Sequence, residues 1–232
     1  MAHLPGKKVI WLALILVLIT IGVLWWAGTK TKEKRSEQLG RYYQELITKE
    51  KNLETAVTNA KSATNQEPSW EIPTNNNWQI VEIKTSSATS TTALKQYGLA
   101  LGEALGTFGQ KRESEVKATY QALDQKLPAE LKKVVSSRLI HEEAINKLRL
   151  MIAPQDLADY HRQLINSLQN SVQFLSQMEQ VLDNPEKALE ASRLFVQESI
   201  LFHQIMIKIS NYLSSRQVQF SDNEKIKALF QL

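Results

Sequence analysis

The stretch LADYHRQLINSLQNSVQFLSQMEQVL, residues 157–182, decides the fold class of this chain. One set of residues, here called the stripe, recurs along it at alternating spacings of three and four positions: His161, Leu164, Leu168, Ser171, Leu175, Met178 and Leu182. This spacing places the stripe on one face of a helix. A helix with such a face buries it against other helices, so the stretch predicts a helical bundle.

Prolines begin the helical segments around this stretch. Pro128, Pro154 and Pro185 each precede a run with helical periodicity, and proline is favoured in the first turn of a helix. The breaks between the long segments are short, so consecutive helices must run antiparallel. We therefore predict an all-α fold with an up-down four-helix bundle over residues 92–217 and a short C-terminal helix over 218–232.

The first segment of the predicted bundle contains a row of glycines. In YGLALGEALGTFG, residues 97–109, Gly98, Gly102 and Gly106 are spaced four residues apart beside an apolar stripe. Glycine costs about 1 kcal/mol relative to alanine inside a helix, so close packing of a neighbouring helix is the expected compensation. Two alternatives remain open: a helix break at Gly109, and a groove that binds a ligand.

Residues 9–28, VIWLALILVLITIGVLWWAG, contain no charged residue. A run of about twenty apolar residues spans the hydrocarbon core of a bilayer, so the sequence predicts a transmembrane helix from Val9 to Gly28. Trp25 and Trp26 are suited to the membrane interface at its end and do not fit a signal-peptide cleavage site. Residues 1–8 form a short basic tail.

The orientation of this predicted span rests on conflicting signals. The basic residues after it outnumber Lys7 and Lys8 before it, which favours a cytoplasmic C-terminal side: Lys30, Lys32, Lys34, Arg35 and Arg41. A short tail ending in two lysines is also typical of an uncleaved signal anchor, and long domains translocate regardless of charge. We expect an extracytoplasmic domain.

A stalk and a linker are predicted between the span and the bundle. Residues 29–62 read as a polar helical stalk in which Leu39, Tyr43 and Leu46 lie near heptad spacing. Such a stalk dimerises as a coiled coil, lies against the domain or stands free in solvent. Residues 63–91 are rich in Asn, Ser and Thr and predict a linker, with extended coil at 78–84.

Composition excludes several classes of function. The chain has no cysteine, which excludes disulfides, thiolate metal sites and cysteine nucleophiles. The formal net charge is only +4, so no basic face for nucleic acid is predicted. No phosphate-binding loop, serine-hydrolase elbow or zinc-binding helix motif is present, so we expect no enzyme activity, no cofactor and no metal.

Polar residues do recur on the apolar faces of the predicted helices: Arg138, His141, Asp159, His161, Glu198 and His203. Glu198 interrupts the apolar stripe of the last long segment, and a buried carboxylate must be paired or neutral. Arg138 or a histidine is the expected partner. We interpret these residues as buried polar contacts that fix the register of the helices. The alternative is a site that binds a ligand, senses protons or binds a metal weakly.

Three segments, ALKQYGLALG, LADYHRQLINSL and NPEKALEA, resemble a group of single-pass proteins of candidate-phyla bacteria with an anchor, a polar linker and a helical domain. The resemblance covers residues 93–212. Proteins of that group often have an Asp-Pro pair before the last long helix. In this chain the two residues are separated by one position, as Asp183, Asn184 and Pro185. The group has no established activity, and the resemblance implies a bacterial envelope protein with its domain outside the cytoplasm.

These inferences predict a membrane-anchored, non-enzymatic helical bundle that acts through protein–protein contact at the bacterial cell envelope. The expected partners are the lipid bilayer and either another envelope protein or a second copy. The alternative function is an extracytoplasmic ligand-sensing bundle that works with a partner subunit. An enzyme with an unfamiliar site around Glu198 and His161 is the third possibility.

Overall fold

The computed structural model describes residues 37–49, 51–52, 81–108, 114–221 and 225–230. The chain forms two compact units, Met1–Tyr42 and Tyr43–Leu232. Residues 37–49 and 51–52 are helical, which covers part of the predicted stalk. The predicted basic tail and transmembrane helix, and most of the predicted linker, lie outside the described residues.

The second unit is mainly helical, which confirms the predicted fold class for the residues that the structure describes. Its helices are α2 (Thr91–Leu105), α3 (Glu115–Asp124), α4 (Leu131–Leu150), α5 (Ala158–Met178), α6 (Pro185–Ser215) and α7 (Lys225–Phe230). Single 3-10 turns, η1 (Pro128–Glu130) and η2 (Gln155–Leu157), precede α4 and α5.

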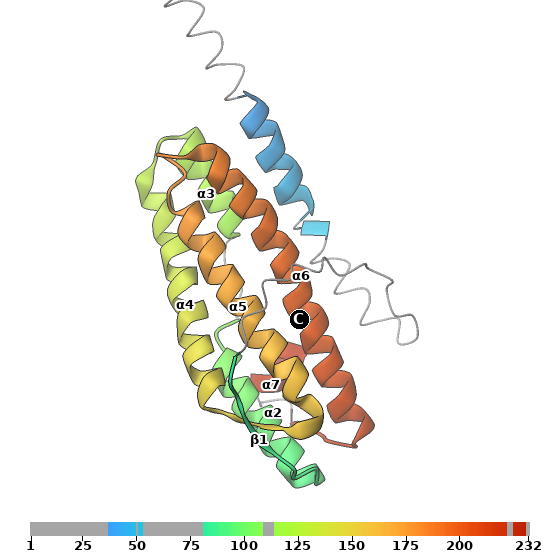
Figure 1. Cartoon of the computed structure of the whole chain (residues 1–232). Coiled ribbons are helices and arrows are strands. Elements are labelled where there is room, and N and C mark those ends of the chain that lie inside the picture. Colours follow the sequence, from blue (N-terminus) through green and yellow to red (C-terminus); the bar gives the residue numbers. More distant parts are fainter. Residues whose placement is uncertain (1–36, 50, 53–80, 109–113, 222–224, 231–232) are drawn as a thin grey trace, which may run out of the picture. The chain divides into compact units, whose positions relative to one another are not determined.

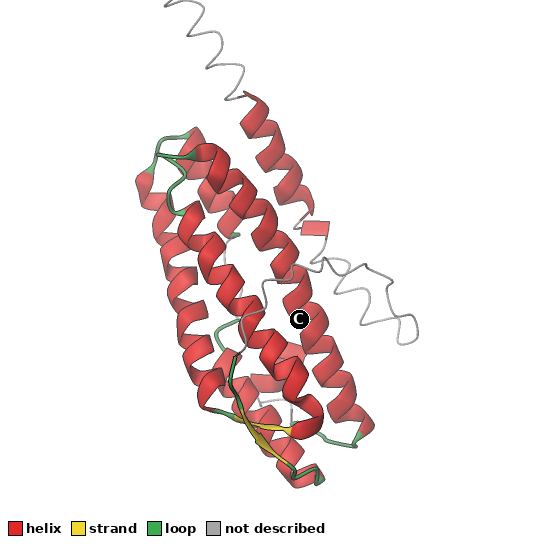
Figure 2. Ribbon diagram, in the orientation of Figure 1, coloured by secondary structure: helices red, strands yellow, loops and turns green. Residues whose placement is uncertain are grey.

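Helices α4, α5 and α6 form the main body of the bundle and lie side by side, as Figures 1 and 2 show. Helix α5 packs on both α4 and α6. The short connections 151–157 and 179–184 make consecutive helices antiparallel. Helix α6 begins where predicted: Pro185 is its first residue, and the Asn184 side chain caps it by accepting from the amide of Lys187.

The first predicted long segment is two helices, so the prediction of four uninterrupted segments is wrong there. Helix α2 ends at Leu105, and a turn follows in which the Phe108 amide donates to the Leu105 carbonyl at 2.8 Å. Helix α3 begins after Ser114, whose hydroxyl caps it by accepting from the amide of Lys117 at 3.1 Å. The N-cap serine and the glycine at the end of α2 favour separate helices over one long one.

The expectation of extended coil alone before the bundle is also corrected. Strand β1 (Lys84–Ser86) pairs in parallel with β2 (Ile152–Pro154), with Thr85 opposite Ala153. Proline disfavours the helical conformation for the residue before it, so Ala153 remains extended. Pro154 therefore ends a short strand, and α5 begins only at Ala158.

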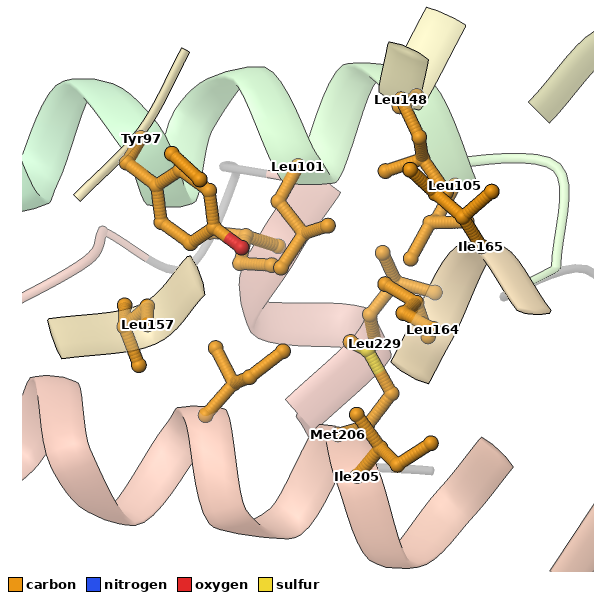
Figure 3. Close-up of a cluster of buried hydrophobic side chains, with 14 of the residues drawn as sticks. Tyr97, Leu101, Leu105, Leu148, Leu157, Leu164, Ile165, Ile205, Met206 and Leu229 are labelled. Atoms are coloured by element: carbon orange, nitrogen blue, oxygen red, sulfur yellow. The ribbon is translucent and has the colours of Figure 1, made fainter. Parts of the chain in front are cut away.

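The main core lies between α2, α4, α5, α6 and the C-terminal segment. Figure 3 shows Leu101 and Leu105 of α2 facing side chains of the other helices across this core. Leu229 of α7 is 5% exposed and lies in the same cluster. The C-terminal segment is therefore part of the core, since the burial of its apolar side chains stabilises the bundle.

A second core joins the helix at 43–49 to α3, α4, α5 and α6. Tyr43 is fully buried and Leu46 is 8% exposed, and both belong to a cluster that contains Val116 of α3 and Phe195 of α6. The predicted stalk seam thus packs on the bundle at these two positions. The side chain of Leu182, at the end of the stripe that predicts α5, lies beyond the last residue of that helix and is exposed.

Candidate functional site

His161 is a buried polar residue that connects three helices. Its side chain has no exposed surface. Its Nε2 lies 3.0 Å from the carbonyl oxygen of Leu148, in the last turn of α4, and its Nδ1 lies 3.1 Å from the hydroxyl of Tyr97 on α2. A carbonyl can only accept, so Nε2 carries the proton and the Tyr97 hydroxyl donates to Nδ1.

These two hydrogen bonds fix the tautomer of the neutral imidazole, and burial favours the neutral form. Burial lowers the pKa of His161 below its usual value of 6.5, and the bond to the Leu148 carbonyl offsets part of this change. Burial also raises the pKa of Tyr97. His161 is therefore a neutral connector between α2, α4 and α5, with both ring nitrogens engaged.

His141 and His203 lie beside a group of aromatic rings. Phe108, in the turn after α2, stacks on Phe202 of α6 with centroids 5.4 Å apart. Two histidines lie at the edge of this group. The ring centroid of His141 lies 4.8 Å from that of Phe108, and the ring centroid of His203 lies 5.7 Å from that of Phe202. Their Nδ1 atoms bond to backbone carbonyls one helical turn earlier, so each Nδ1 carries a proton. The group joins α4 and α6 at the break between α2 and α3.

Arg138 binds carboxylates other than the one predicted. Its Nε donates to Glu179 at 2.6 Å and its Nη1 to Glu142 at 2.7 Å, and both bonds raise the pKa of the guanidinium. Glu179 follows the last residue of α5. The predicted pairing of Arg138 with Glu198 is therefore wrong, because the guanidinium binds Glu142 and Glu179 while Glu198 accepts from Asn170. The ion pair between Arg138 and Glu179 connects α4 to the end of α5.

Glu198 of α6 is 8% exposed and faces the polar side of α5. Its Oε2 accepts from the amide of Asn170 at 3.2 Å, and its backbone carbonyl accepts from the Ser167 hydroxyl at 3.4 Å. Its Oε1 is buried without a hydrogen-bond partner among the described residues, as is Oδ1 of Asn166. Burial raises the pKa of Glu198, and the two neighbouring side chains offset part of the rise.

The predicted polar set thus occupies separate places in the bundle. His161 connects the helix ends near β2, His141 and His203 flank the aromatic group, and Glu198 contacts α5. Asp159 is paired with Arg162 on the surface of α5 at 2.6 Å. Within the described ranges, no group of three or more His, Asp or Glu side chains is placed to hold a metal ion.

The glycine row of α2 is covered by the C-terminal segment. A Cβ at Gly102 would lie 2.6 Å from the backbone nitrogen of Ile226 in α7. At Gly98 the added atom would overlap the ring of Phe220, and at Gly106 it would lie 3.0 Å from the Lys225 side chain. Lys225 also binds Glu103 of α2 at 2.7 Å. The close approach is thus made by a short helix far along the chain.

Tyr43 makes the most specific contact of the 43–49 helix. Its ring stacks on that of Tyr120 in α3, with centroids 5.7 Å apart and planes 30° apart. Burial raises the pKa of Tyr43 to about 12, and the neighbouring Ser192 hydroxyl of α6 offsets part of the rise. The Ser192 hydroxyl donates its hydrogen bond to the Ala188 carbonyl. The Tyr43 hydroxyl has no partner within hydrogen-bond geometry among the described residues.

Sequence reasoning missed Tyr97 and Asn170 as polar contacts of the interior, and Tyr43 as a buried contact with Tyr120. Tyr97 belongs to the apolar stripe beside the glycines of α2, where its hydroxyl gives no separate signal in the sequence. Asn170 lies between Ser167 and Ser171, and this polar run in an otherwise apolar face is the pattern that indicates a buried polar contact.

The proposed anchor residues, Val9, Trp25, Trp26 and Gly28, lie outside the described part of the chain. Among the helices that are described, none combines the length and the apolar character that a membrane crossing requires.

Comparison of the chain with protein-family models, with curated proteins and with solved structures found no match.

Proposed function

We propose that this chain is a membrane-anchored, non-enzymatic helical bundle that acts through protein–protein contact at the bacterial cell envelope. The observation that carries the proposal is the uncharged apolar run at 9–28, which precedes a helical domain. The run is the transmembrane helix of the proposal, with Trp25 and Trp26 at the membrane interface. The domain lies outside the cytoplasm.

The polar groups inside the bundle support a binding function over a catalytic one. Both ring nitrogens of His161 are bonded within the protein, which leaves neither for acid–base work. Arg138 is held by two carboxylates and connects two helices. These residues hold the helices in register, as expected for a domain whose surface does the binding.

Membrane fractionation tests the proposal. The full-length chain should remain in the membrane pellet after alkaline carbonate extraction, and a chain lacking residues 9–28 should appear in the supernatant. A reporter fused at Leu232 that is active only outside the cytoplasm should be active. Release of the intact chain by carbonate would contradict the anchor, and an inactive reporter would contradict the orientation.

A second candidate function, ligand sensing with a partner subunit, is favoured by the buried carboxyl of Glu198. Oε1 of Glu198 is buried without a hydrogen-bond partner among the described residues, and a small polar ligand would satisfy it. A ligand that binds there raises the melting temperature of the chain. Screening cationic and amide-bearing small molecules against wild type and Glu198→Gln distinguishes this function, because binding at this site must be lost in the variant.

A further inference from the structure

The solvent side of α4 and the strand after it carry three exposed large apolar side chains. Leu139 is 53% exposed, Leu150 is 75% exposed, and Ile152, the first residue of β2, is 58% exposed. Leu139 and Leu150 are about three helical turns apart, so they lie on the same side of α4, roughly 16 Å apart along its axis. Single exposed apolar residues are ordinary, but these are aligned along one side of the bundle.

This side of α4 is opposite the side that enters the core. His141 and Leu148 are buried, and each lies about half a turn around the helix from the two exposed leucines. Figure 1 shows α4 along one side of the bundle. The exposed residues that share this outward direction are here called the outer face of α4: Lys132, Leu139, Glu143, Asn146 and Leu150.

The backbone after α4 places Ile152 beside this face. Met151 is extended and its side chain packs against the main core, so its neighbours Leu150 and Ile152 both point away from the core. Lys84 of β1 is the register partner of Ile152 and is also exposed. The outer face therefore continues at this corner as an apolar pair with a cation beside it.

The charge of α4 is unevenly compensated. Its sequence contains more basic than acidic residues, whereas α5 and α6 each contain equal numbers. Both acidic residues of α4 are paired with a cation of the same helix, Glu142 with Arg138 and Glu143 with Lys147, each at 2.7 Å. The cations that make no ion pair with a described residue lie on the outer face or next to it: Lys132, Arg149 and Lys84.

We propose that the outer face of α4 and the adjoining corner at Ile152 lie on the anionic surface of the membrane that anchors the chain. The apolar side chains enter the boundary between headgroups and acyl chains, and the unpaired cations bind lipid phosphates. The inference rests on the proposed function, because the anchor keeps this face near lipid at a high effective concentration.

Two features favour lipid over a protein partner. Glu143 and Asn146 separate the two leucines, so the outer face has no continuous apolar seam for a partner helix. Single aliphatic side chains enter a bilayer without a complementary pocket. The unpaired cations complement anionic headgroups, and at the corner Lys84 and Arg149 outnumber the exposed Glu82.

A fluorescent probe on the outer face tests the contact. The chain has no cysteine, so Asn146→Cys gives a single labelling site between the leucines. Full-length chains labelled there with the fluorophore NBD are reconstituted into phosphatidylcholine vesicles with or without phosphatidylglycerol, and lipids carrying a doxyl quencher are included in the same bilayer. We expect quenching in the anionic vesicles, and its loss in phosphatidylcholine alone or at high salt.

Variants identify the groups that make the contact. Arg149→Gln should lower the ratio of quenched to unquenched probe about fivefold, the effect of one basic residue near an anionic surface. Leu139→Ser should lower this ratio as well, since it removes an inserted apolar side chain. Lys187→Gln, an exposed cation on α6, should leave the ratio unchanged. A label at Asn211→Cys, an exposed asparagine on α6, should not be quenched.

Several results would overturn the proposal. An unquenched probe at position 146 in anionic vesicles would do so, as would equal quenching at position 211. Quenching only by doxyl lipids in added protein-free vesicles would indicate contact with a facing membrane, and shielding only in native membranes would indicate a protein partner. Flotation separates the two ideas: chains that float with the vesicles without quenching contradict this contact alone, and chains that do not float contradict the anchor of the proposed function.

Discussion

Tyr97 on α2 donates its hydroxyl proton to Nδ1 of His161 on α5 across 3.1 Å, in a part of the core where His161 has no exposed surface. The same imidazole donates from Nε2 to the Leu148 carbonyl in the last turn of α4, which also accepts from the amide of Met151 at 3.1 Å. One side chain thus joins three helices.

Replacing Tyr97 by phenylalanine removes only the hydroxyl and leaves Nδ1 of His161 as a buried acceptor without a donor. Such a group costs about 1–3 kcal/mol, and each kcal/mol lowers the melting temperature by about 2–4 °C for a domain of this size. We expect the full-length chain in detergent to melt several degrees lower. Tyr160→Phe is the matched control, because its ring contact with Lys208 does not use the hydroxyl. Equal melting temperatures for wild type and Tyr97→Phe would contradict the hydrogen bond.

His161 also predicts a pH dependence. Its pKa is lowered in the folded chain, so the unfolded chain binds a proton below about pH 6.5 while the folded chain does not. The free energy of unfolding therefore falls as the pH drops below 6.5, by up to about 1.4 kcal/mol per pH unit, until the folded pKa is reached. Urea unfolding from pH 7.5 to pH 5 measures this slope.

His161→Gln is the control for this slope, since its amide can donate to the Leu148 carbonyl and accept from Tyr97 without titrating. The difference in unfolding free energy between wild type and variant should shrink as the pH falls through the window. A constant difference would show that the imidazole titrates normally.

For Glu198 we expect the opposite pH dependence of the free energy of unfolding. Burial raises its pKa above the usual 4.5, so the folded chain holds a proton that the unfolded chain releases. Its contribution to stability is complete below pH 4.5 and is lost as the pH rises through the folded pKa. Glu198→Gln keeps an acceptor for Asn170 and cannot ionise. Near pH 4 the urea midpoint of the variant should equal that of wild type, and at pH 8 it should be higher. Equal midpoints at pH 8 would contradict a raised pKa of Glu198.

The sequence predicted features that depend on local pattern. Leu164, Leu168 and Leu175 of the opening stretch are buried as their spacing indicates, and Pro185 begins a helix. These features follow from helical period and capping within one segment. They require no knowledge of what lies opposite.

Features that depend on distant parts of the chain were not predictable in the same way. The glycine row of α2 indicates close packing but not the neighbour, which is α7, more than a hundred residues later in the chain. Strand β1 has too weak a pattern to identify β2 as its partner, because a three-residue strand carries little periodicity. The contact of Glu198 with Asn170 depends on which helix lies opposite Glu198, and one helix alone does not reveal that.

The glycine row leads to a prediction that distinguishes backbone from side-chain contact. A methyl group at Gly102 would meet the backbone nitrogen of Ile226, so α7 must shift, whereas at Gly98 it meets the end of the Phe220 ring, which can turn. Gly102→Ala should cost about 1–3 kcal/mol and Gly98→Ala clearly less. Urea unfolding of both variants measures the difference. Equal costs would mean that α7 does not lie against α2 as described.

Tyr43 yields a prediction in which two substitutions at one position have opposite signs. Its ring is fully buried against Tyr120, and its hydroxyl has no hydrogen-bond partner among the described residues. Tyr43→Phe keeps the ring contact and removes a buried polar group, so it should hold the 43–49 helix more tightly and slow proteolysis there. Tyr43→Ala removes the apolar contact and should accelerate cleavage, because burial of such a ring contributes about 2 kcal/mol or more. Limited proteolysis of the full-length chain, with Tyr42→Phe at an exposed neighbour as control, measures both rates. Faster cleavage of Tyr43→Phe than of wild type would show that the hydroxyl is bonded in solution, and that docking of this helix depends on a polar contact rather than on the ring alone.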